Sequence, residues 1–128
     1  MNLLLDTCTF LWLITGSSAL SQKARDVFQD PANEVYLSSV SVWEMMIKYG
    51  LGRLSLPDLP ERFIPVQRER HGIDSLDLVE EAVLQLYKLP HYHRDPFDRM
   101  LICQAQFHGY ALLTPDEKIT AYPVRCIW

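Results

Sequence analysis

The sequence predicts an α/β fold in which helices cover both faces of one central parallel sheet. Short apolar runs of strand length alternate along the chain with stretches of helical periodicity. Strands that are separated by helices pair in parallel through right-handed crossovers. The 128 residues also contain no linker, internal repeat or low-complexity tract. We therefore expect a single three-layer α/β/α domain over residues 1–128, with about five strands in its sheet.

The first half of the chain supplies two of the expected strands. An apolar run over residues 2–5 ends at Asp6, and Ser21 is a typical N-cap that precedes a helical stretch stopped before Pro31. A strongly apolar helix follows the second strand and ends at Gly50 and Gly52. The elements expected here are a strand over 2–5, helices over 9–15 and 21–29, a strand over 34–37 and a helix over 39–49.

The second half supplies the other three strands. Residues 54–60 contain two prolines and predict a loop, while Pro96 suits the first position of a helix that Gly109 closes. The elements expected here are helices over 61–71, 78–88, 96–108 and 115–121, strands over 72–76, 110–113 and 124–128, and a polar loop over 90–95.

The composition indicates a cytosolic globular protein without a membrane segment. Hydrophobic residues make up 48% of the chain and charged residues 22%, which is ordinary for such a protein. No run reaches the roughly 18 uncharged apolar residues of a membrane helix. The apolar start, residues 1–14, lacks the basic region of a signal peptide and is interrupted by Asp6.

Cysteine count and net charge exclude two further classes of site. The three cysteines are odd in number and none forms a C-x-x-C pair, which argues against a disulfide framework and a cysteine zinc site. The net charge of −4 argues against simple electrostatic binding of nucleic acid. That objection weakens if several acids cluster and are neutralised by bound cations.

Three acidic residues have both a structural and a functional interpretation. Asp6 ends the first strand and suits an N-cap of the next helix. Asp98 suits an acid in the first turn of a helix that Asp95 caps. Asp116 lies within Thr114-Pro115-Asp116-Glu117, a Thr-x-x-Glu capping box.

Glu44 resists the capping interpretation because it lies inside its helix. The helix is apolar almost all round, so we expect it to be largely buried. A buried carboxylate is costly unless it is paired or bound to a metal. An ion pair with a nearby arginine is therefore the main alternative to a metal site.

Taken together, the four acids fall on one edge of the predicted sheet. Asp6 and Asp116 each follow a strand, Asp98 opens a helix, and Glu44 lies just over one turn into another. Ligands of such sheets bind at the carboxyl ends of the strands. Crowded carboxylates repel one another, and a bound Mg²⁺ or Mn²⁺ relieves this, since both prefer oxygen ligands. The pattern indicates metal-assisted phosphodiester hydrolysis.

With these acids in these positions, the chain resembles the PIN-domain ribonucleases, and among them the VapC-type toxins of bacterial toxin–antitoxin pairs. The resemblance runs over essentially the whole chain, through four segments whose order and spacing are more specific than any one of them. These are Leu3-Leu4-Leu5-Asp6-Thr7, Ser39-Val40-Ser41-Val42-Trp43-Glu44, His93-Arg94-Asp95-Pro96-Phe97-Asp98-Arg99-Met100-Leu101-Ile102 and Leu112-Leu113-Thr114-Pro115-Asp116.

The resemblance implies a set of site residues and a reaction. Asp6, Glu44, Asp98 and Asp116 match the acidic positions of the family, which hold Mg²⁺ or Mn²⁺. Thr7 and Thr114 match hydroxyl positions beside the metal, and Asp95 resembles an accessory acid that otherwise caps its helix. The implied catalytic set is Asp6, Glu44, Asp98, Asp116, Asp95 and Thr114. The implied activity is cleavage of single-stranded regions of RNA, such as tRNA or other structured RNA, by a homodimer that a VapB-type antitoxin holds inactive.

Several neighbouring residues have a plainer interpretation. His91 and His93 suggest a metal pair, but histidines in a polar loop are more often surface residues. Arg94, Arg99 and Lys118 flank the acids and suit either solvated charges or contacts to phosphate.

Three rival functions remain to be compared with this one. A receiver-like, Mg²⁺-binding signalling domain normally has adjacent acids after its first strand and a lysine after its last, but Thr7 follows Asp6 and no lysine follows residues 124–128. A phosphatase of the Asp-x-Asp type would need an acid where Cys8 stands. A PIN fold kept only for binding is disfavoured by the intact acids.

Overall fold

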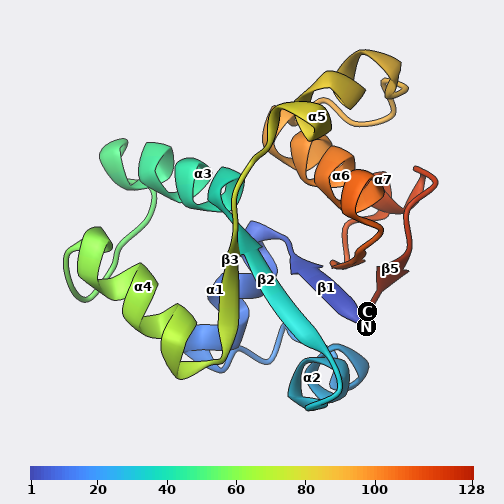
Figure 1. Cartoon of the computed structure of the whole chain (residues 1–128). Helices are drawn as coiled ribbons and strands as arrows, with labels where there is room; N and C mark the ends of the chain where they lie inside the picture. The colour runs from blue at the N-terminus through green and yellow to red at the C-terminus, as the bar shows by residue number, and fades with distance from the viewer.

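The structure, a computed structural model that describes residues 1–128, has a five-stranded parallel sheet at its centre (Figure 1). The strands lie in the order β3-β2-β1-β4-β5, and every neighbouring pair is parallel. This arrangement confirms the predicted fold class. The strands are β1 (Asn2–Leu5), β2 (Glu34–Ser38), β3 (Ile73–Leu76), β4 (Ala111–Leu113) and β5 (Cys126–Ile127).

Helices cover both faces of this sheet, as Figure 1 shows. One face packs against α1 (Thr7–Thr15), α2 (Gln22–Gln29) and α4 (Pro60–Arg70), and the other against α6 (Pro96–His108) and α7 (Glu117–Thr120). None of these helices combines the length and apolar character that crossing a membrane requires.

The central strand β1 divides the core between these two layers. Leu3 and Leu5 pack into one buried cluster and Leu4 into the other, because successive side chains of a strand point to opposite faces. All three leucines are fully buried, which fits the continuous apolar run of a strand covered on both sides.

Helix α3 (Ser39–Gly50) lies across the carboxyl edge of the sheet. It contributes Met45 to one core cluster and Val40 to the other, so it spans the boundary between the layers. Because β1 pairs with both β2 and β4, the residues that follow these three strands leave the sheet at the same edge. They are Asp6, Ser39 and Thr114.

Most predicted helices differ from the structure by one or two residues at an end, and two differ in a way that has a physical reason. The stretch over 78–88 divides into α5 (Glu80–Val83) and a 3₁₀ helix (Leu84–Lys88), which ends where Leu89 becomes extended before Pro90. The helix over 115–121 begins only at Glu117, with Asp116 as its N-cap. The predicted Thr-x-x-Glu capping box is therefore wrong.

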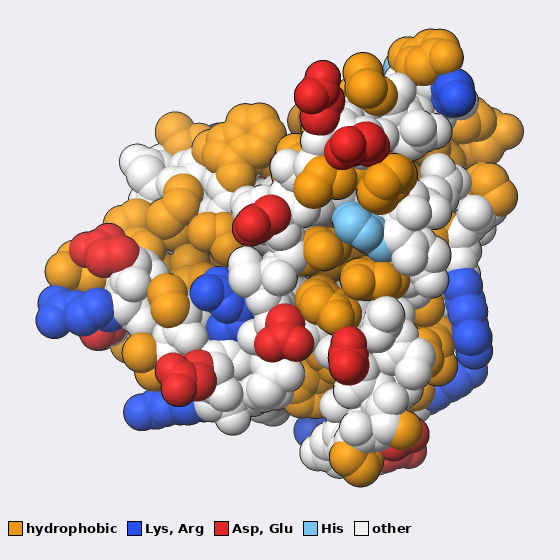
Figure 2. All heavy atoms as spheres, viewed as in Figure 1, with side chains coloured by type: hydrophobic (Ala, Val, Ile, Leu, Met, Phe, Trp, Pro, Cys, Tyr) orange, Lys and Arg blue, Asp and Glu red, His pale blue; other side chains and the backbone are white.

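The expectation that helix α3 is largely buried is also wrong. Only a stripe that includes Glu44 and Met45 is buried. Trp43 is 59% exposed and Ile47 39% exposed, and apolar side chains gather over the part of the surface where α3 lies (Figure 2). Trp43 makes an edge-on contact with Phe97, at 4.9 Å between ring centroids, but more than half of the residue stays exposed.

Candidate active site

The four acids of the predicted site line one pocket at the carboxyl edge of the sheet. The pocket has a volume of about 270 Å³ and brings together residues from α1, α3, α6 and the turn before α7. The expectation that the acids meet at this edge is confirmed, while their individual roles stay a prediction. The residues that line the pocket are Asp6, Thr7, Cys8, Trp12, Glu44, Lys48, Asp95, Asp98, Pro115 and Asp116.

Asp6 both caps a helix and lines the pocket. Its Oδ1 accepts a hydrogen bond from the Thr9 N–H at 2.7 Å, which makes it the N-cap of α1. Its Oδ2 accepts one from the Thr114 hydroxyl at 2.5 Å. Burial raises the pKa of Asp6, and the hydrogen bonds from Thr114 and Thr9 oppose this shift. The two interpretations of Asp6 are therefore compatible.

Thr114 contributes through Asp6 rather than by lining the pocket. It is almost fully buried, and its hydroxyl accepts a hydrogen bond from the Asp116 N–H at 3.1 Å while donating to Asp6. The residue thus connects two of the acids, one after β1 and one after β4.

Glu44 is buried, and each of its two carboxylate oxygens contacts one other side chain. Its Oε1 accepts a hydrogen bond from the Thr7 hydroxyl at 2.7 Å, and its Oε2 lies 2.7 Å from the Lys48 Nζ. The ion pair considered in place of a metal site thus exists, but its partner is a lysine one turn along α3 and not an arginine. The hydrogen bond to Glu44 raises the pKa of Lys48, so the ammonium stays charged beside the pocket.

Asp95 and Asp98 open helix α6 together. The Oδ1 of Asp95 accepts hydrogen bonds from the N–H groups of Phe97 and Asp98, at 2.8 and 3.0 Å. Asp95 is thus the N-cap that the sequence predicts, and it also lines the pocket. Burial, followed by the nearby Asp95 carboxylate, raises the pKa of Asp98 to about 7, although His93 opposes the shift.

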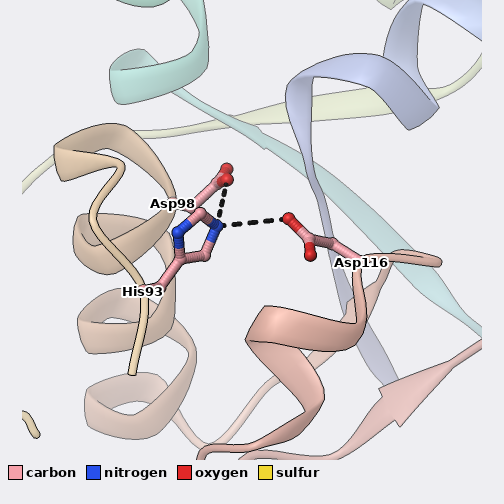
Figure 3. A group of neighbouring side chains, drawn as sticks. All are labelled: His93, Asp98 and Asp116. Carbon is pink, nitrogen blue, oxygen red and sulfur yellow. Dashed lines mark hydrogen bonds and ion pairs between the residues drawn. The ribbon is translucent and has the colours of Figure 1, made fainter. Parts of the chain in front are cut away.

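His93 belongs to the site, although the sequence analysis favoured a surface residue over a metal ligand at this position. Only 7% of the residue is exposed, and its ring lies between two of the acids (Figure 3). Its Nε2 is 2.8 Å from the Asp98 Oδ2 and 3.2 Å from the Asp116 Oδ2. Interpreting His93 as a surface residue was therefore wrong, whereas His91 is exposed. The available signal was its position two residues before the N-cap Asp95, which holds it beside the first turn of α6.

The three basic residues that flank the acids have different environments. Arg94 and Lys118 are exposed, which is compatible with contacts to phosphate. Arg99 is buried and donates to the carbonyl oxygens of Pro90 and Leu89, at 2.7 and 3.3 Å. A phosphate contact by Arg99 is therefore excluded, because its guanidinium holds the loop before α6.

The chemistry of the pocket fits a hard divalent cation. Five carboxylates line it, among them the four predicted acids from separate elements, and Lys48 is the one basic residue among the lining side chains. Burial raises the pKa of Asp98, and the nearby Asp95 carboxylate adds to this shift, as is typical of buried carboxylates that lie close together. Carboxylate oxygens are the preferred ligands of Mg²⁺ and Mn²⁺, so the residues present suit either ion.

Comparison with known proteins places this geometry in a family. Residues 3–124 match the PIN domain family model. The chain is 34% identical, over 56 residues, to Ribonuclease VapC16 of Mycobacterium tuberculosis, a stretch that covers 44% of this chain and 40% of that protein. The match thus spans less than half the length of the curated relative.

Solved structures share the fold across nearly the whole chain. The crystal structure of VapBC2 from Rickettsia felis, bound to a DNA fragment from its promoter, aligns with a TM-score of 0.71 at 13% identity, over 98% of this chain and 97% of that one. The structure of VapBC-1 from nontypeable Haemophilus influenzae aligns with a TM-score of 0.64 at 19% identity, over 98% and 96%. At these identities the likeness concerns the fold alone. Since the family match covers almost every residue, the chain belongs to the PIN domain family.

Proposed function

We propose that this protein is a metal-dependent endoribonuclease and the toxin of a VapBC-type toxin–antitoxin pair. The observation that carries the proposal is the convergence of Asp6, Glu44, Asp98 and Asp116 on one pocket of a PIN fold. The likeness to Ribonuclease VapC16 supports the activity, and the likeness to VapBC structures supports the biological setting.

The four acids are the proposed ligands of Mg²⁺ or Mn²⁺. When bound, such a cation supplies Lewis acidity to the scissile phosphate and to the attacking water. The protein keeps the carboxylates in place: Thr114 orients Asp6, and Thr7 together with Lys48 orients Glu44. Each of these hydrogen bonds fixes a carboxylate that would otherwise rotate, which is how outer contacts tune a metal site.

Asp95 has a supporting role in the same proposal. Its side chain holds the first turn of α6, and Asp98 lies in that turn and lines the pocket. Arg94 directly precedes Asp95, and Lys118 lies two residues after Asp116. Both side chains are exposed and suit contacts to RNA phosphates on either side of the cut.

The partners follow from the same assignment. We propose an RNA substrate, with tRNA or other structured RNA as the first to test, a homodimer, and a VapB-type antitoxin as inhibitor. An acidic pocket suits inhibition by a basic antitoxin side chain that enters it. We also infer a cytoplasmic location, where such RNAs are found and where three free cysteines stay reduced.

Removal of divalent metal tests this function. Purified protein incubated with a mixture of tRNA and messenger RNA should produce discrete fragments in Mn²⁺ or Mg²⁺. Fragment formation should fall to background in excess EDTA and return when Mn²⁺ exceeds the chelator. Cleavage that persists unchanged in EDTA would contradict metal dependence, and binding of RNA without any cut would favour a PIN fold kept for binding.

A further inference from the structure

We propose that His93 is a positioning residue of the metal centre, whose Nε2–H donates to the Asp116 carboxylate and whose Nε2 lies in close contact with the Asp98 carboxylate, and that it does not itself bind the cation. The inference rests on the proposed function and assigns a role to a residue outside the four acids. It follows from three features of the structure: the place of the ring, the hydrogen bond at its other nitrogen, and the contacts that hold its backbone.

The place of the ring joins two acids from different elements. Asp98 lies in the first turn of α6 and Asp116 caps α7, and the Nε2 of His93 reaches one oxygen of each (Figure 3). The hydrogen bond to Asp116 is 3.2 Å long and the contact with Asp98 is 2.8 Å. One donor between two carboxylates reduces their repulsion and fixes their separation.

The other ring nitrogen shows which atom carries the proton. The backbone N–H of Asp95 donates to Nδ1 of His93 at 3.2 Å. A backbone N–H is always a donor, so Nδ1 must act as the acceptor and a neutral ring carries its proton on Nε2. An imidazole nitrogen that binds a cation has no proton, and its other nitrogen normally donates. The hydrogen bond from Asp95 therefore favours donation to carboxylates over binding of the metal through Nε2.

The backbone of His93 is held by a buried clamp, defined here as Tyr122 and Arg99. The Tyr122 hydroxyl accepts hydrogen bonds from the N–H groups of Tyr92 and His93, at 3.0 and 2.9 Å, and donates to the Pro90 carbonyl at 2.6 Å. The guanidinium of Arg99 bonds to the same carbonyl and to the Tyr122 hydroxyl.

The clamp explains why the charged side chain of Arg99 is buried, although the proposed function gives it no role in catalysis. Arg99 is 7% exposed, yet its hydrogen bonds go to two carbonyl oxygens and a hydroxyl and none goes to a carboxylate. A buried guanidinium is costly, and here its three hydrogen bonds go to the Leu89 and Pro90 carbonyls, which precede His93, and to the Tyr122 hydroxyl. These contacts fix the loop relative to α6 and α7. His93 can set the distance between Asp98 and Asp116 only if its loop is fixed in this way.

Titration with Mn²⁺ tests the role of His93. His93→Ala removes the donor, and the dissociation constant for Mn²⁺ should rise by about 10- to 100-fold, as is typical for loss of a contact that orients metal ligands. His93→Gln places an amide N–H in reach of the same carboxylates and should restore affinity to within a few-fold of wild type. His91→Ala, at the exposed neighbouring histidine, is the matched control and should bind as wild type does. Equal affinity of His93→Ala and wild type would overturn the inference while leaving the proposed function in place.

Pulsed electron paramagnetic resonance of wild-type protein loaded with Mn²⁺ completes the test and needs no variant. The spectrum should lack the coupling of a directly bound imidazole nitrogen. A strong coupling of that kind would make His93 a ligand and overturn the inference, even if His93→Ala fails to fold. Wild-type protein that binds no Mn²⁺ would overturn the metal-dependent function, and the inference with it.

Discussion

Asp6→Asn should lower the rate of RNA cleavage by about 100-fold or more, since loss of a metal ligand costs at least as much as loss of a residue that orients one. Asparagine matches aspartate in size and removes the negative charge that the proposed cation needs. The rate constant for fragment formation under excess Mn²⁺ measures this effect.

The same substitution should leave the fold intact. Asparagine is as good an N-cap as aspartate, so it keeps the hydrogen bond from the Thr9 N–H that starts α1. It also removes a buried carboxyl whose pKa is raised by burial, which means that ionisation of Asp6 opposes folding. The Thr114 hydroxyl loses its acceptor where the amide nitrogen replaces Oδ2, which opposes this gain. The free energy of unfolding of the metal-free protein, measured in urea, should therefore change by no more than about 1 kcal/mol. Asp74→Asn, at an exposed acid of β3, is the control and should keep full activity. Equal cleavage by Asp6→Asn and wild type would remove Asp6 from the site.

The affinity for Mn²⁺ should rise steeply with pH and level off above about pH 7. The pKa of Asp98 is raised to about 7, so below that value the carboxyl must lose a proton before it binds the cation. Release of one proton corresponds to about a tenfold gain in affinity for each pH unit well below the pKa, or roughly 50-fold between pH 5 and pH 7. Calorimetric titration with Mn²⁺ across this range measures the slope. Asp98→Asn should bind weakly with a flatter profile, and a flat profile in wild type would contradict the account.

Without metal, the same group makes stability change with pH in the opposite direction. Asp98 ionises near its ordinary pKa of 3.8 in the unfolded chain and near 7 in the folded protein, so the folded state holds the proton between these values. Stability falls with rising pH wherever the folded state binds more protons. The contribution of Asp98 therefore lowers the stability of the metal-free protein as pH rises from about 4 to about 7. Bound metal should reverse this trend.

The strands and the meeting of the acids were predictable from the sequence because both depend on simple rules. A fully buried parallel strand is a continuous apolar run, as in Leu3, Leu4 and Leu5. The acids that follow such strands share one edge of the sheet whatever the details of the helices. Asp6 and Asp95 each cap a helix and also line the pocket. At these two positions, a capping role therefore does not exclude a place in the site.

The contacts within the site were not predictable because they depend on loops and on side chains far apart in the sequence. The backbone N–H of His93 donates to the Tyr122 hydroxyl, and the sequence does not indicate this contact because the two residues lie 29 positions apart. Lys48 was overlooked because its helix was expected to be largely buried and an arginine was expected as the partner of Glu44. In the structure, the side of α3 that carries Trp43 and Ile47 is exposed. Arg99 has the charge of a phosphate contact but lies beneath the loop.

The most direct test of the central claim is the position of Mn²⁺ in crystals of the wild-type protein, located by its anomalous scattering. We expect a peak in the pocket at the carboxyl edge of the sheet, with oxygen ligands drawn from Asp6, Glu44, Asp98 and Asp116. No such peak should form in crystals of Asp6→Asn soaked at the same Mn²⁺ concentration. A peak outside the pocket, or no peak in wild type at a concentration that supports cleavage, would contradict the account.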